Sequence, residues 1–166
     1  MDAMLCSNCG AEARIVSGKN YRFKETPLKH VMLHGIDLVE CPECKNVDPI
    51  IPSLKDLFSS LAYAVVNKPS RLRGDEIRFL RKYIHKTQGQ FARILQLDPT
   101  TISKYENNDD VPGPQTDKLI RLVAIALGDD GLKARIDVAV KQFENIEDVA
   151  RTGRLEWKKT GEVQYA

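Results

Sequence analysis

Four cysteines form two C-x-x-C pairs, Cys6 with Cys9 and Cys41 with Cys44, and 31 residues separate Cys9 from Cys41. Each pair can form a tight turn that points two sulfurs the same way. Four thiolates can then enclose one metal ion tetrahedrally and leave no position for water. In a reducing compartment this pairing favours metal ligation over disulfides. We therefore expect a structural Zn²⁺ site that contributes much of the folding free energy of a small module.

Two other metal sites are compatible with parts of this pattern. His30 and His34 have the spacing of a finger with two cysteines and two histidines, but KHVMLHG is typical of a strand. In a strand, residues four apart are too distant to chelate one ion. Four thiolates can also hold iron and carry electrons, as in rubredoxin, although that leaves the C-terminal half without a role. The four-cysteine zinc site remains the hypothesis, with both histidines as ordinary strand residues.

A second stretch with potential chemistry is TQGQFARILQLDPTTISKYENN, residues 87–108. Its pattern predicts two short helices joined by a tight turn at Gln96–Leu97. Thr87 and Asp98 are the expected N-caps, and Pro99 suits the first helical position. Turns of this kind typically carry Gly, so Gln96 must adopt an unusual backbone conformation or shift the turn.

The two faces of these helices have different compositions. The inward face is apolar and comprises Phe91, Ala92, Leu95, Leu97, Ile102 and Tyr105. The outward face is polar and comprises Gln88, Gln90, Thr100, Thr101, Ser103 and Lys104. In a helix-turn-helix, the second helix enters the major groove and the start of the first contacts phosphate. We predict DNA binding by these six residues; a purely structural helical hairpin is the alternative.

The charge of the chain is unevenly distributed. The 166 residues are 42% hydrophobic and 29% charged, with a formal net charge of +2, which is typical of one or two small globular domains. Residues 67–128 contain 11 Lys and Arg against 7 Asp and Glu, net +4, whereas residues 1–66 and 129–166 each have 7 against 8, net −1. We expect a polyanion to meet the basic residues Lys68, Arg71, Arg73, Arg78, Arg81, Lys82 and Lys86. A solvated helix face is the alternative.

Several classes of protein are disfavoured by the sequence. No apolar run approaches the roughly 18 residues of a membrane span. The N-terminal MDAMLCSNCG lacks the layout of a secretory signal, so we expect a cytoplasmic location and no membrane partner. An enzyme is not expected, because there is no nucleophile paired with a base, no phosphate-binding glycine loop and no open metal position.

The sequence pattern of the elements that must position these residues predicts an α+β fold with two modules and a tail. Residues 1–66 form a β-rich four-cysteine zinc module closed by an amphipathic helix that Ser53 caps. After a linker at 67–71, residues 72–145 form an all-α helix-turn-helix domain, with a core helix in QTDKLIRLVAIALG and one further helix in GLKARIDVAVKQF. The C-terminal extension, residues 146–166, forms either a small hairpin or an irregular tail.

The chain resembles the MqsA (YgiT-type) antitoxin family, which joins a zinc module to an Xre-like helix-turn-helix. The resemblance rests on the motifs CSNCG and CPEC, on their separation, and on TQGQFARILQLDPTTISKYE. The resemblance covers roughly residues 4–128. It places the family's zinc ligands on the four cysteines and its base-reading Asn and Arg on Thr100 and Lys104, so a different operator is implied. It also implies a homodimer formed through the C-terminal domain, a toxin partner bound chiefly by the zinc domain, and repression of the protein's own promoter.

These observations predict a sequence-specific repressor that binds a palindromic operator in double-stranded DNA and serves as the antitoxin of a type II toxin-antitoxin pair. A stand-alone zinc-finger regulator of the Xre type is one alternative. A zinc-built protein-interaction module without DNA binding is the other.

Overall fold

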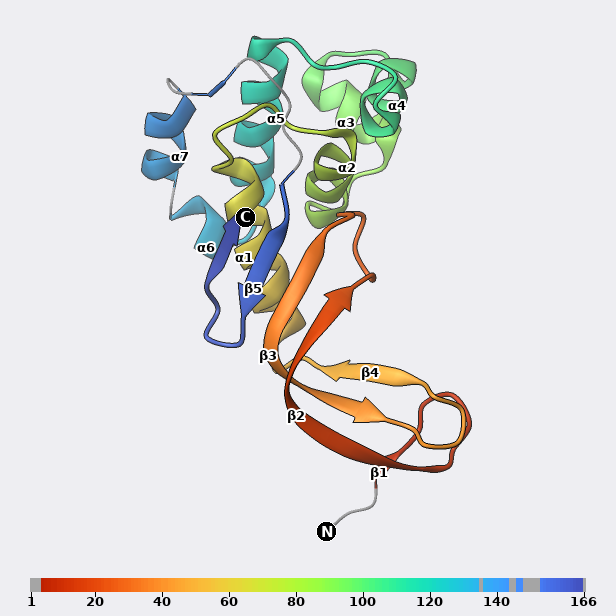
Figure 1. The fold of residues 1–166 in the computed structure, drawn as a ribbon. Helices are drawn as coiled ribbons and strands as arrows, with labels where there is room; N and C mark the ends of the chain where they lie inside the picture. The colour runs from red at the N-terminus through yellow and green to blue at the C-terminus, as the bar shows by residue number, and fades with distance from the viewer. Residues whose placement is uncertain (1–3, 135, 144–145, 148–152, 166) are drawn as a thin grey trace.

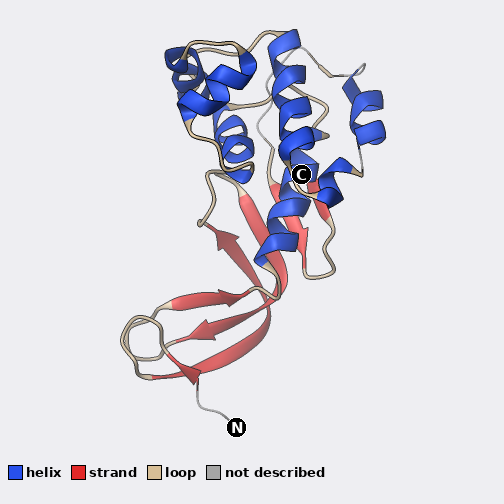
Figure 2. Cartoon of the chain, turned by 180° about the vertical axis from the view of Figure 1, so that it is seen from behind, coloured by secondary structure: helices blue, strands red, loops and turns tan. Residues whose placement is uncertain are grey.

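The computed structural model describes residues 4–134, 136–143, 146–147 and 153–165. The fold is mixed α and β: a curled sheet projects from a group of helices (Figures 1 and 2). We call the projecting part, residues 4–17 and 39–50, the β arm, and the helices with the sheet beneath them the helical body. None of the described helices is long and apolar enough to cross a membrane.

One sheet runs through both parts. Its strands are β1 (Met4–Leu5), β2 (Glu12–Phe23), β3 (Val31–Glu40), β4 (Val47–Ile50), β5 (Leu155–Lys158) and β6 (Val163–Tyr165). The antiparallel pair β2–β3 lies at the centre of this sheet, and β1 pairs antiparallel with β2. On the other edge of β3, the outer half pairs with β4 and the inner half pairs in parallel with β5. Strand β3 thus joins the arm to the C-terminal hairpin.

The sheet bends where the arm leaves the body (Figure 1). The β2–β3 register shifts between Val16 and Lys19 and again between Lys19 and Tyr21. Gly18 and Gly35 both have positive φ there, +70° and +68°. Irregularities of this kind bend a strand and increase its twist, so the outer halves of β2 and β3 turn away from the helices.

The helices are α1 (Leu54–Val66), α2 (Gly74–Tyr83), α3 (Gln88–Leu95), α4 (Pro99–Asn107), α5 (Pro114–Leu127), α6 (Asp130–Lys133) and α7 (Ile136–Gln142). Ser53 caps α1 as predicted, accepting a hydrogen bond from the backbone N–H of Asp56. The single helix predicted over residues 131–143 is wrong. Asp129 caps a separate short helix that buries Leu132 and has its C-cap at Ala134, while Val138 and Val140 of α7 are exposed.

A single hydrophobic core connects the helices with the inner sheet. It includes Phe23, Val31 and Leu33 from the sheet together with buried residues of α1 to α5. Helix α1 packs against α2, α5 and α6 and against both strands of the C-terminal hairpin. The helix that was expected to close the first module is therefore also part of the core of the second.

The segment predicted as a linker is held rigidly against α5. The fully buried Arg121 guanidinium donates to the backbone carbonyls of Val66, Lys68 and Ser70 at 2.7 to 2.9 Å. Asp117 accepts from Arg121 and from the backbone N–H of Leu72, both at 2.7 Å. These bonds satisfy the backbone carbonyls at the end of α1 and in the segment that follows it, and the N–H of Leu72 just before α2. They fix how the two helices meet.

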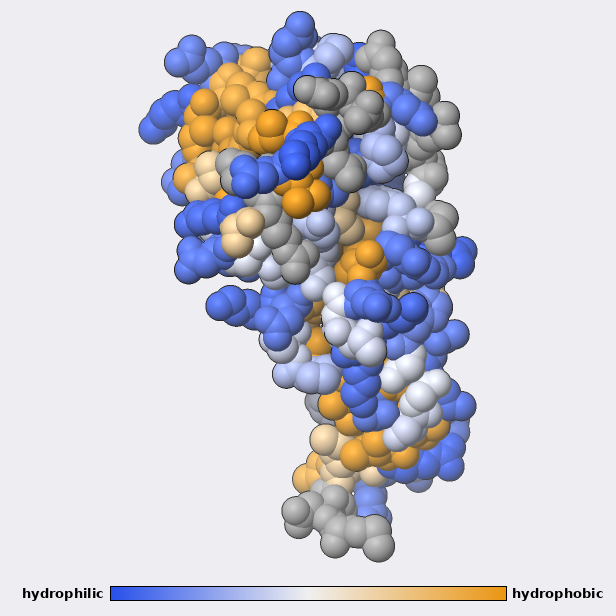
Figure 3. Space-filling view, turned by 90° about the vertical axis from the view of Figure 1, so that its left-hand side faces the viewer, coloured by the Kyte–Doolittle hydropathy of each residue, from blue (hydrophilic) through white to orange (hydrophobic). Residues whose placement is uncertain are grey.

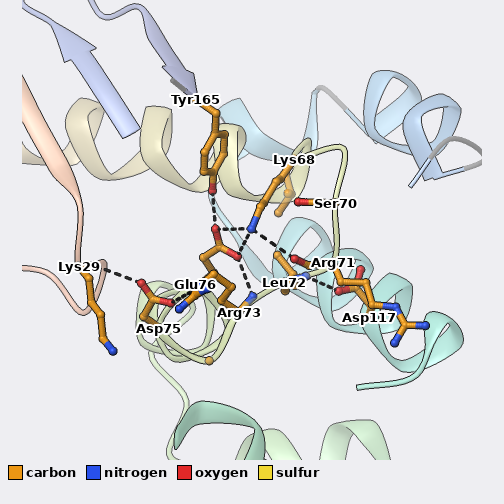
Figure 4. A network of polar contacts seen from close by, with 12 residues as sticks. Lys29, Lys68, Ser70, Arg71, Leu72, Arg73, Asp75, Glu76, Asp117 and Tyr165 are labelled. Atoms are coloured by element: carbon orange, nitrogen blue, oxygen red, sulfur yellow. Dashed lines mark hydrogen bonds and ion pairs between the residues drawn. The ribbon is translucent and has the colours of Figure 1, made fainter. Parts of the chain in front are cut away.

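The tail forms a hairpin, the first of the two predicted alternatives. Strands β5 and β6 pair with each other and bury Leu155 and Trp157. At the end of β6, the Tyr165 hydroxyl donates to Glu76 Oε1 at 2.9 Å, and Lys68 Nζ lies 2.9 Å from both Glu76 oxygens (Figure 4). Burial raises the pKa of Glu76, and Lys68 opposes that rise. This buried cluster fastens the hairpin to the start of α2.

Candidate metal centre and nucleic-acid interface

The four cysteines meet at the outer end of the β arm. Their sulfurs all lie within 4.8 Å of one another, with Cys6 and Cys44 at 3.5 Å and Cys9 and Cys41 at 3.6 Å. A tetrahedral ion with bonds of about 2.3 Å requires sulfurs about 3.8 Å apart. The donor set therefore fits one metal ion. Cys6 and Cys41 are buried, while Cys9 and Cys44 are exposed.

The two cysteine turns are built in the same way. In the first, Gly10 N–H donates to Cys6 O and Cys6 N–H donates to Ala11 O. In the second, Lys45 N–H donates to Cys41 O and Cys41 N–H donates to Asn46 O. Gly10 and Lys45 have matching positive φ values, +73° and +60°, so Lys45 occupies a position suited to glycine.

The surroundings of the sulfurs change how easily each loses its proton. The backbone N–H of Asn46, helped by Asn8, lowers the pKa of the Cys44 thiol to about 6. The backbone N–H of Ala11 lowers the pKa of Cys9, but the neighbouring sulfurs of Cys44 and Cys41 raise it overall to about 12. Thiolates crowded together without a cation repel one another, and a metal ion removes that repulsion when it displaces the protons.

His34 does not belong to this centre. Its Nδ1 lies 3.1 Å from Asn20 Oδ1 and its Nε2 lies 3.9 Å from Glu156 of the C-terminal hairpin. Among the described residues, the cluster that can hold a metal ion consists of cysteines. His34 is thus an ordinary strand residue, as predicted, whereas His30 directly precedes β3 and is not part of it.

Helices α3 and α4 are joined by a tight turn at the predicted position. Thr87 caps α3 and forms a capping box with Gln90, and Asp98 caps α4 with Pro99 in its first turn. Gln96 adopts the left-handed conformation, with φ 53° and ψ 43°, where a glycine is typical. Phe91, Ala92, Leu95, Ile102 and Tyr105 are buried, as expected for the inward face.

A buried carboxylate holds the inner side of α4. The Glu106 side chain is fully buried and accepts hydrogen bonds from the guanidinium of Arg81 on α2 through both of its oxygens. Gln88 at the start of α3 donates to the same carboxylate at 2.9 Å, and Arg78 approaches it at 3.3 Å. Burial raises the pKa of Glu106, but these donors lower it below its usual value. Three helices are thus held in one geometry.

The six predicted DNA-contacting residues are placed differently from one another. Gln88 points inward to Glu106, and the Gln90 side chain accepts from the backbone N–H of Thr87. The hydroxyl of Thr100, which is exposed, donates to Asp98. The side chains of Thr101, Ser103 and Lys104 make no hydrogen bond or ion pair within the described part of the chain. These three and Thr100 share one side of α4.

The basic run expected to meet a polyanion requires a correction. Lys68 and Arg81 are buried against Glu76 and Glu106, so they are not available to a partner. Arg121 is likewise buried against Asp117. Since three cations and three acids of residues 67–128 cancel in this way, the surface of that region keeps eight Lys and Arg against four Asp and Glu, the same excess of +4.

The residues that support α4, which are Gly74, Glu106 and Asn108, were not identified from the sequence. Gly74 lies so close to α4 that a Cβ would come within 2.5 Å of Glu106 O and closer still to Tyr105 O. The side chain of Asn108 accepts from Gly74 N–H at 2.9 Å. The available signal was Glu106 itself, a charged residue beside Tyr105 on the inward face, which requires a buried partner.

Comparisons with protein-family models, with curated proteins and with solved structures gave no match to this chain.

Proposed function

We propose that this chain is a sequence-specific DNA-binding repressor in which α3 and α4 act as a helix-turn-helix. The observation that carries the proposal is the contrast between the two sides of α4. Its inner side is anchored by Ile102, Tyr105 and Glu106, while its outer side presents small hydroxyls and Lys104. Small hydroxyls permit close approach to base edges and thymine methyls, and Lys104 is long enough to reach guanine O6 or a phosphate.

The surface charge around these helices supports a polyanionic partner. Arg93 and Lys104 are exposed, and the excess of +4 in residues 67–128 remains on the surface. Phosphate contacts of this kind supply the sequence-independent part of DNA affinity. Asp109 and Asp110, which follow α4 and are exposed, must lie away from the DNA backbone in this arrangement.

A homodimer would give the repressor two recognition helices. Hydrophobic side chains gather at the helical end of the molecule (Figure 3). Among the side chains that the structure describes, the large apolar residues exposed on α5 and α7 are Leu119, Leu127, Val138 and Val140. A two-fold axis through this surface suits a palindromic operator whose half-sites are about 34 Å apart. Light scattering tests this: Leu119→Glu should yield monomers, whereas Lys19→Glu on β2, away from α5 and α7, should leave the mass unchanged.

The proposed resident metal is Zn²⁺. Four thiolates without an open position are typical of structural zinc sites, and the spacing of the sulfurs fits its bond length. Bound there, Zn²⁺ would be held by Cys6, Cys9, Cys41 and Cys44 and would supply cross-linking rather than reactivity. Elemental analysis of the purified chain distinguishes zinc from iron.

We further propose that the β arm binds a cognate toxin, in line with the resemblance of the two cysteine pairs and helix-turn-helix to the MqsA family. Apolar residues near the metal centre are exposed, including Leu5 at 66% and Ile15 at 55%. Exposed apolar surface next to a rigid cross-link is suited to protein contact. In the competing function, the chain is an interaction module that binds its partner through this surface, and the outer side of α4 contacts no DNA.

The deciding experiment is a salt titration of the zinc-loaded chain with fluorescent DNA from its own promoter, against random competitor. Specific binding should survive the competitor and weaken steeply with salt. Lys104→Glu should abolish it, whereas the matched charge reversal Lys133→Glu, far along the chain on α6, should not. Thr100→Val should change the preferred sequence more than the affinity.

Two results would overturn the proposal. Binding that competitor abolishes would indicate non-specific association alone. Equal affinity of the wild type and of Lys104→Glu would remove α4 from the interface and favour the interaction module.

A further inference from the structure

A cavity of about 550 Å³ lies between the first turns of α1, the C-terminal half of α2 and the loop that joins β2 to β3. It is distant from the cysteines, and the outer side of α4 does not line it. Its volume falls within the range of small-molecule sites, which extends from about 300 to 1,000 Å³. The proposed DNA and metal sites leave this cavity without a role.

The floor of the cavity is aromatic. Phe58, Phe79 and Tyr83 line it and continue a ladder that starts at Phe23. Successive ring centroids are 6.2 and 6.1 Å apart from Phe58 through Phe79 to Tyr83, with interplanar angles of 30° and 24°. Aromatic rings that line a cavity offer faces and edges against which a planar ring can stack.

The acidic groups of the cavity are already satisfied by the protein. Asp129 caps α6, and it accepts from the Tyr83 hydroxyl at 2.7 Å and from Ser59 at 3.3 Å. Glu25 accepts from Tyr21 and from the backbone N–H of Lys24. Burial raises the pKa of Tyr83 to about 12, with Asp129 adding to the effect, so this hydroxyl stays neutral at physiological pH.

The basic groups of the cavity are not satisfied in the same way. The side chains of Lys82 and His85 make no hydrogen bond or ion pair with any residue that the structure describes. Lys55 also lines the cavity, near Asp129. Lys82 and His85 are therefore the lining groups with hydrogen-bonding capacity left for an anion, while Glu25 and Asp129 are held by bonds within the protein.

His85 forms the left-handed C-terminal cap of α2, in which Lys86 N–H donates to Arg81 O. It follows the end of α2 with φ 55°, a conformation that costs free energy for residues other than glycine. This end of α2 places His85 among the residues that line the cavity.

We propose that this cavity binds a planar aromatic carboxylic acid in its ionised form. The ring system stacks on Phe58 and Tyr83, and the carboxylate faces Lys82 and His85. One or two fused rings suit the volume. The proposal stands independently of DNA binding.

The test uses the full-length chain and 2-naphthoate as the probe, followed by calorimetry and by amide chemical shifts. Matched probes are the neutral 2-naphthamide and the cationic 2-naphthylmethylamine, which keep the ring system. The acid should bind about fivefold more tightly than the amide, and the amine most weakly. Shift changes should centre on Phe58, Phe79 and Tyr83.

Variants separate the two parts of the site. Lys82→Gln should weaken the binding of 2-naphthoate about fivefold and leave the binding of the amide unchanged. Lys19→Gln on β2 should affect the binding of neither probe. Phe58→Leu should weaken both, with its fold checked by thermal melting. Absence of binding at millimolar naphthoate, equal affinities for the three probes, or shift changes centred elsewhere would each overturn the proposal.

Discussion

Lys45 stores backbone strain beside the metal centre. Its φ of +60° matches that of Gly10 in the equivalent turn, and a side chain in this conformation costs about 1 kcal/mol or more. Lys45→Gly should therefore raise the stability of the metal-loaded chain by about 1 kcal/mol relative to Lys45→Ala. Thermal melting measures the difference.

The alanine variant is the matched control, because both variants lose the bond from Lys45 Nζ to Pro42 O. Equal melting temperatures for the two would show that the turn relaxes and that no strain is stored there.

Glu106 is the residue on which the geometry of α2, α3 and α4 depends. Glu106→Gln keeps the shape but leaves the buried Arg81 without its counter-charge, which should cost about 3 kcal/mol at pH 7. The folded-state pKa of Glu106 is lowered, so its stabilisation is present above the unfolded pKa of about 4.3 and is lost as the pH falls through the folded value. The stability difference between the two proteins should thus shrink in acid.

Urea unfolding followed by circular dichroism, at pH 7 and at about pH 3.5, tests this linkage. The comparison must be between the two proteins, because acid also protonates the cysteines of both. A difference that stays constant with pH would mean that Glu106 is protonated in the folded state.

Sequence reasoning succeeded at residues whose role is local. Thr87, Asp98 and Ser53 were predictable as caps, because a cap needs an oxygen directly before a helix. The burial of Lys68 and Arg81 was not predictable, because their partners are 8 and 25 positions away in the chain. The type of a basic residue alone does not predict whether its side chain faces water.

At the scale of elements, the crossing of α2 and α4 depends on a missing side chain. A Cβ on Gly74 would lie within 2.5 Å of Glu106 O, and backbone atoms cannot rotate away. Gly74→Ala should therefore destabilise the chain by about 3 kcal/mol and disturb the presentation of α4. Chemical denaturation measures the first effect, and DNA titration measures the second.

Gly89 provides the matched control, because a Cβ there meets nothing within 4 Å. Since Gly89 lies inside α3, Gly89→Ala should stabilise the chain by about 0.5 kcal/mol. Changes of the same sign for both variants would contradict close packing as the cause.

The elements themselves were predictable where their patterns were local. The stretch forming α3, its turn and α4 contains its caps, its apolar face and its terminating residues within 87–108. The parallel pairing of β5 with β3 was not predictable, since it joins residues more than 100 positions apart and no local signal specifies a partner.

At the scale of the whole molecule, the β arm and the helical body differ in what stabilises them. Among residues 4–17 and 39–50, the buried residues are Cys6 and Cys41, two of the proposed metal ligands. The body buries a continuous core that runs from the inner sheet through α5. The arm thus lacks an apolar core of its own, and the proposed metal ion at its end would supply the missing stabilisation.

Removal of the metal should therefore unfold the arm and spare the body. With a strong chelator, amide hydrogen exchange should become fast in β1, in β4 and in the outer halves of β2 and β3, while α1 to α5 keep their protection. The bend at Gly18 and Gly35 should mark the boundary, because inside it the strands pack against the helices. Restored zinc should restore protection. Global unfolding on chelation would show that the body needs the arm, and unchanged exchange in the arm would show that its hydrogen bonds suffice without a metal ion.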